Sequence, residues 1–159
     1  LGILLIFEST TGFIIHQYQS ILTPFLVMFF AMLVSTGGNT SGQTSAITIQ
    51  GMSSGDINET NTWKFLRREF FIGLCLAMVL ALISFVRVYL SHHQAWESFI
   101  VSFALGVIVL VSVLLGASLP LVLKKLGGDP AFSAGPVLAT VMDIFGIFIY
   151  CYVAYLILT

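Results

Sequence analysis

The sequence predicts an all-α membrane protein with five transmembrane helices, and two observations carry that prediction. Hydrophobic residues make up 58% of the 159 residues and charged residues only 8%, whereas soluble domains have about 25% charged residues. The apolar residues also gather in long stretches, and a helix needs about 20 of them to cross a bilayer. Such a chain belongs in lipid, and its length suits a single domain over residues 1–159.

Five stretches have the length and apolar character of spans. They run from Leu1 to Tyr18, from Ile21 through at least Val34, from Trp63 to Leu90, from Gln94 to Lys124 and from Pro130 to Leu158. The last begins with Asp129 and Pro130, the pattern of an N-cap followed by the first residue of a helix. The chain opens in the middle of an apolar stretch without a signal peptide, so we expect a further domain upstream in the full-length protein.

The basic residues predict how the spans are oriented. Three of them, Lys64, Arg67 and Arg68, start the third span, and two, Lys124 and Lys125, end the fourth. In a chain with five spans these five residues lie on one side of the membrane and Arg87 lies on the other. The positive-inside rule then puts the N-terminus in the cytoplasm and the C-terminus outside. An upstream domain would therefore be cytosolic. No basic patch of the kind that binds nucleic acid is formed.

The polar stretch after the second apolar run, Ser35 to Ile57, is unusual for a membrane chain. Read over Ser35 to Gln50 as a continuation of the second helix, it places Thr36, Asn39, Gln43 and Gln50 on one stripe. One interpretation is close helix packing, with the glycines as small residues and the amides as interhelical hydrogen-bond partners. The other is a face exposed to water beside a pore, because polar groups survive in a membrane only when buried or lining water.

Asp143 lies near the middle of the fifth span, in "GPVLATVMDIFGIFIY". A carboxylate at the bilayer centre costs about 2.5–3.5 kcal/mol on insertion scales and by default marks an ion or proton path. Pro136 frees the backbone carbonyl four residues back, and small residues share the face of Asp143. Carboxylate and carbonyl oxygens suit Mg²⁺, Ca²⁺ and Mn²⁺. The alternative is a structural, hydrogen-bonded aspartate.

The remaining acids separate into two kinds. Glu8, in the first span, is a possible secondary cation site, whereas Glu69 beside Arg67 and Arg68 is expected to form an interfacial ion pair. No nucleophile–base pair, phosphate loop or haem ligand pair is present in the sequence, so we do not expect an enzyme.

Two sequence blocks together resemble a known family. "GGNTSGQTSAITIQGMSSGDI" and, near the end, "LPLVLKKLGGDPAFSAGPVLATVMDIFGIFIY" are similar to the transmembrane domain of the MgtE family of Mg²⁺ channels, over essentially the whole chain. The resemblance implies a homodimer with its pore between protomers, lined by the second and fifth helices. It puts the aspartate that recognises hydrated Mg²⁺ at Asp143 and an ion-facing carbonyl at Ala139, with Gly135 where some members carry asparagine.

The resemblance and the residues together predict a pore that conducts hydrated Mg²⁺ across the bacterial plasma membrane. Family members carry cytosolic regulatory domains, which this chain does not include. A cation-coupled secondary transporter of divalent metals is the alternative, because such proteins also use broken polar helices and a mid-membrane acid. The residues expected to line the pore are Thr36, Asn39, Gln43, Gly135, Thr140 and Gly146.

Overall fold

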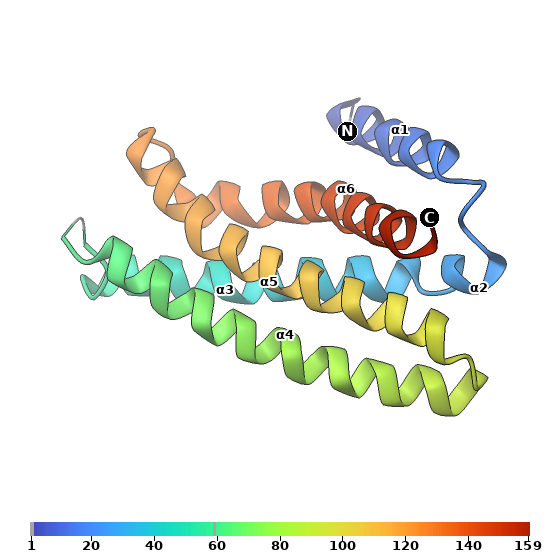
Figure 1. The fold of residues 1–159 in the computed structure, drawn as a ribbon. Coiled ribbons are helices and arrows are strands. Elements are labelled where there is room, and N and C mark those ends of the chain that lie inside the picture. Colours follow the sequence, from blue (N-terminus) through green and yellow to red (C-terminus); the bar gives the residue numbers. More distant parts are fainter. Residues whose placement is uncertain (1, 59) are drawn as a thin grey trace.

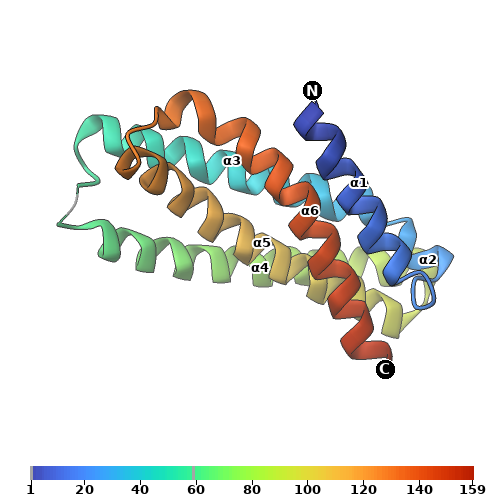
Figure 2. The same cartoon turned by 90° about the horizontal axis from the view of Figure 1, so that it is seen from above.

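The computed structural model describes residues 2–58 and 60–159, apart from the side chains of residues 2–8, 132, 133 and 136. It confirms the all-α class: α1 (Gly2–Gln17), α2 (Pro24–Val27), α3 (Phe30–Ser54), α4 (Thr62–His92), α5 (Ala95–Lys125) and α6 (Pro130–Leu158). Helix α5 is central and packs against α3, α4 and α6, while α1 packs against α6 (Figures 1 and 2).

The spans agree with the sequence in part. Four of the described segments are long and apolar enough to cross a membrane: Pro24–Ser54, Thr62–His92, Ala95–Lys125 and Val137–Leu158. Helix α1 has 16 residues and is therefore about 24 Å long, shorter than a bilayer core of about 30 Å. The first predicted span thus stays a prediction, whereas a multi-pass chain is established.

The basic residues lie near the ends of the long helices, in the two groups that the sequence predicts. The α3–α4 and α5–α6 connections lie at the same end of the molecule (Figure 1). Lys64, Arg67 and Arg68 follow the first connection, Lys124 and Lys125 precede the second, and Arg87 lies toward the far end of α4. We call the end with five basic residues the basic end; its location in the cytoplasm stays a prediction.

The second predicted span is interrupted between α2 and α3. Thr23 caps α2 by accepting a hydrogen bond from the Leu26 N–H at 3.3 Å, with Pro24 in the first turn. The hydroxyl of Tyr150, on α6, donates to the Leu26 carbonyl at 2.9 Å. Tyr150 is fully buried, and its ring meets Phe30 edge-on at a centroid distance of 5.4 Å. This contact therefore joins α6 to the corner between α2 and α3.

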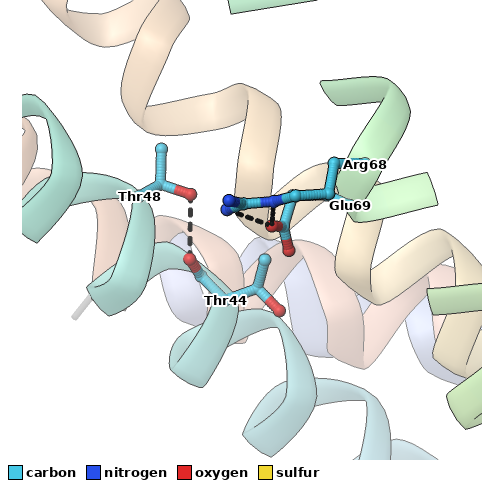
Figure 3. Close-up of polar contacts among 4 residues, drawn as sticks. All are labelled: Thr44, Thr48, Arg68 and Glu69. Atoms are coloured by element: carbon cyan, nitrogen blue, oxygen red, sulfur yellow. Dashed lines mark hydrogen bonds and ion pairs between the residues drawn. The ribbon is translucent and has the colours of Figure 1, made fainter. Parts of the chain in front are cut away.

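The polar stretch is helical, as the sequence predicts, and α3 continues through it to Ser54. Two of its buried threonines bond back to the helix. Thr44 donates to the Thr40 carbonyl at 3.0 Å, and Thr48 donates to the Thr44 carbonyl at 2.9 Å (Figure 3). The buried Ser45 hydroxyl has no hydrogen-bond partner among the described residues. Back-bonding of this kind lets polar side chains sit in a membrane helix. Gly55, with a left-handed φ of 83°, ends the helix.

Close helix packing depends on glycines other than Gly38 and Gly42, which the sequence spaces as G-x-x-x-G. A Cβ at Gly38 or Gly42 would meet no described atom within 4 Å, so this G-x-x-x-G pair is open in the protomer. Gly116 of α5 instead lies directly against the Ser41 carbonyl of α3. Gly37 of α3 also packs closely, since a Cβ there would lie 2.9 Å from Ile108 Cγ2. The glycines thus set the approach of α3 to α5.

Candidate ion-binding site

Helix α6 carries the predicted acid on an exposed strip. Its start is as predicted, because the Asp129 side chain accepts a hydrogen bond from the Ala131 N–H at 2.9 Å. Gly135, Ala139 and Asp143 recur at every fourth position and all are exposed in the protomer. We call these three residues the acidic strip. Asp143 is near the middle of α6 and lies within the segment Val137–Leu158 that is long and apolar enough to cross a membrane.

Packing against α3 and α5 sets the rotation of α6. Met142 is fully buried, and a Cβ at Gly37 would lie 3.0 Å from its Cε. One turn later Gly146 meets α3, with a built Cβ 3.5 Å from Val34 Cγ2. Since consecutive helical residues differ by about 100°, burial of Met142 turns Asp143 to the edge of the α3–α6 contact and outward.

The predicted stripe on α3 is exposed but points elsewhere. Asn39 and Gln43 are exposed, and Thr36 is half-buried with its hydroxyl donated to the Met32 carbonyl at 2.7 Å. At about 100° per residue, Asn39 and Gln43 lie about 160° and about 120° around the helix axis from Gly37, which packs against α5 and α6. The last amide, Gln50, lines a groove between α3 and α4. The polar stripe of α3 and the acidic strip of α6 therefore face in different directions.

The other predicted site residues have mixed surroundings. Thr140 is half-buried, whereas Gly146 is buried in the α3–α6 contact just described. Glu8 belongs to α1, and its side chain is outside the part of the chain that the structure describes. Among the described residues, no three His, Cys, Asp or Glu side chains gather into a metal-binding group. The described part of the chain thus offers the acidic strip as its candidate site.

Two acids have structural roles, and one tyrosine was missed. Glu69 is buried and accepts a hydrogen bond from Arg68 Nη2 at 3.0 Å, which confirms the predicted ion pair (Figure 3). Asp129 caps α6, also as predicted. The contact between Tyr150 and Leu26 was not predicted from the sequence. No local signal could have found it, because the partners are 124 residues apart.

The long apolar helices and the mid-helix carboxylate together define a multi-pass membrane protein with the features of an ion-transport domain. A family model, that of the MgtE divalent cation transporters, matches residues 30–153. The chain therefore belongs to the MgtE family, as its sequence blocks predict.

Three curated relatives extend the match over almost the whole chain. The magnesium transporter MgtE of Thermus thermophilus is 32% identical over 160 residues, covering 99% of this chain and 35% of the relative. Those of Bacillus subtilis and Enterococcus faecalis are 29% and 27% identical, covering 93% and 95% of this chain and 33% and 34% of the relatives. The chain thus spans about a third of the length of these relatives.

Proposed function

We propose that this chain forms the membrane domain of a Mg²⁺ transporter of the bacterial plasma membrane, with Asp143 as the residue that recognises the hydrated ion. Membership of a divalent cation transporter family supports the class of substrate. The observation that carries the site is the exposure of Asp143 within a membrane-spanning segment. Mg²⁺ dehydrates reluctantly and is usually held through its waters and one or two carboxylates.

The proposal includes a second copy of the chain. A carboxylate facing lipid costs about 2.5–3.5 kcal/mol on insertion scales, so the acidic strip needs a cover that is polar or wet. Two strips related by a two-fold axis would line one water-filled path, with two carboxylates and with the Ala139 carbonyls one turn away. The open faces of Gly38 and Gly42 leave room for close approach of a partner helix. In this arrangement the basic end and the N-terminus are cytoplasmic.

One observation favours a cation-coupled exchanger as the second candidate. The helix through the membrane is broken between α2 and α3, and secondary transporters build ion sites from such discontinuous helices. At this break, the Leu26 carbonyl accepts a hydrogen bond from Tyr150 and is not available to an ion at the acidic strip. We therefore rank the channel first. The two mechanisms differ in whether Mg²⁺ movement needs a gradient of another ion.

Flux through the purified, intact protein in liposomes tests the function. With a Mg²⁺ indicator inside and a negative-inside potential, we expect Mg²⁺ to enter down its gradient without any H⁺ or Na⁺ gradient. Liposomes without protein are the control for leakage. Entry only when a counter-ion gradient is imposed would assign the exchanger. Entry no faster than in the empty liposomes would overturn the proposed transport itself.

Thiol accessibility tests whether the α3 amides face water. In a Cys75→Ser background, which removes the exposed native thiol, we expect Asn39→Cys and Gln43→Cys to react with a charged thiol reagent. The rate should exceed that of Leu82→Cys by about tenfold or more, because only a thiolate in contact with water reacts. Leu82 is the matched control, being 66% exposed on the apolar surface of α4. Equal rates at the three positions would place the amides in lipid.

A further inference from the structure

A groove opens at the basic end, between the last turns of α3 and the first turns of α4. It has a volume of about 1130 Å³, and its lining includes residues of both helices and of their connection. We call it the basic groove. The lining residues used below are Ile47, Lys64, Arg67, Arg68, Phe71 and Ile72. This site is separate from the acidic strip, which is on α6.

The rim of the basic groove is positively charged. Lys64, Arg67 and Arg68 all line it, and among its described lining residues only Asp56 is acidic. The Asp56 carboxylate already accepts a hydrogen bond from Ser54 Oγ at 2.6 Å. Of these three, Arg68 forms an ion pair with Glu69 (Figure 3), whereas Lys64 and Arg67 form none with the described residues. Lys64 and Arg67 therefore present their charge to whatever enters the groove.

The walls of the groove are apolar and continue into the lipid-facing surface. Ile47, Phe71 and Ile72 are 55%, 58% and 50% exposed, although each lies within a membrane-spanning segment. Trp63, at the same end of α4, is 77% exposed, and tryptophan is typical of the membrane–water interface. The basic rim is thus at the level of lipid headgroups, with the apolar walls at the level of the acyl chains.

We propose that the basic groove binds an anionic phospholipid, with its phosphate between Lys64 and Arg67 and an acyl chain along Phe71 and Ile72. Basic pockets between transmembrane helices on the cytoplasmic side are a recurrent means of binding anionic headgroups. A soluble phosphate compound would use the rim but leave the apolar walls exposed. The charged rim and the apolar walls together therefore favour a lipid over a soluble phosphate compound. This inference does not depend on the ion that the protein transports.

Native mass spectrometry of the intact protein, titrated with phosphatidylglycerol or phosphatidylcholine in detergent, tests the proposal. We expect the wild type to retain phosphatidylglycerol in preference to phosphatidylcholine. Lys64→Gln with Arg67→Gln should reduce that preference, by about fivefold for each charge removed. The matched control, Lys124→Gln with Lys125→Gln, removes two charges from the same end but outside the groove, and should keep the preference.

Further measurements distinguish a lipid phosphate from a soluble one and cover the case in which the double variant misfolds. Glycerol 3-phosphate, which has the headgroup chemistry without acyl chains, should not displace phosphatidylglycerol at an equal concentration. Displacement would assign a soluble ligand and overturn the lipid. An equal loss in the Lys124→Gln/Lys125→Gln control would show a general surface charge and would also overturn the site. If the double variant fails to fold, Lys64→Gln and Arg67→Gln are measured singly, and an unchanged preference in both refutes the proposal.

Discussion

Asp143→Asn is expected to remove most Mg²⁺ binding and flux while leaving the protein folded. Asparagine keeps the size of the side chain and one acceptor oxygen but has no charge. Hydrogen bonds to a charged group are roughly twice as strong as neutral ones, so two lost charges in a dimer should weaken Mg²⁺ binding by about tenfold or more. Asp143 is exposed in the protomer, so its substitution should hardly change the melting temperature. Calorimetric titration with Mg²⁺, liposome flux and thermal melting give the three readouts.

Glu97→Gln is the matched control for the loss of a carboxylate. Glu97 is in the first turn of α5, away from the acidic strip, and is half-buried. We expect this variant to bind and conduct Mg²⁺ like the wild type. A structural aspartate at 143 would give the opposite pattern, with a lower melting temperature and unchanged Mg²⁺ binding, because breaking its hydrogen bonds leaves buried groups unsatisfied. That result would show that the ion site is elsewhere.

Gly116→Ala is expected to cause the largest loss of stability. A Cβ at this position would overlap the Ser41 carbonyl and lie 2.9 Å from Thr44 Cβ. Backbone atoms of a packed helix cannot move aside as the end of a flexible side chain can. The added methyl group should therefore lower the free energy of unfolding by about 1–3 kcal/mol, the usual cost of overpacking. The melting temperature of the purified protein measures the effect.

Gly106→Ala makes the same substitution in the same helix with the opposite expectation. There a Cβ would lie 3.4 Å from Ala81 Cβ, an ordinary van der Waals contact. The variant should be as stable as the wild type or gain about 0.5–1 kcal/mol, because alanine is the better helix former. If both variants melted alike, the close approach of α3 and α5 at Gly116 would not be the feature that limits substitution.

Helix positions could be predicted well from the sequence where apolar length and capping residues agree. Helix α6 has the predicted bounds, Pro130–Leu158, because Asp129 and Pro130 specify its start and the apolar run its extent. Helix α4 extends the predicted Trp63–Leu90 by only a few residues. The helical state of the polar stretch was also predictable, since its amides recur with a helical period. These features are encoded locally.

Features that depend on contacts between helices could not be predicted in this way. The break after α2 falls within "PFLVMFFAML", where nothing after the starting proline marks an end, and its buried partner is Tyr150. Gly37 packs closely while its neighbour Gly38 is open, although spacing alone treats them alike. For the site, the sequence placed Asp143 within a span. The direction in which it points depends on the burial of Met142 against α3.

The hydrogen bond from Tyr150 to Leu26 has a consequence for how the protein is made. A ribosome adds residues from the N-terminus onward, so the corner between α2 and α3 exists long before its partner on α6 is synthesised. Until that last helix enters the membrane, the carbonyl of Leu26 accepts the Phe29 N–H, at 3.2 Å, but its hydrogen bond from Tyr150 is missing. Insertion of α6 therefore acts as a completion step. A nascent chain stopped short of Tyr150 would have the local hydrogen bonds of the corner but not the contact that joins it to α6.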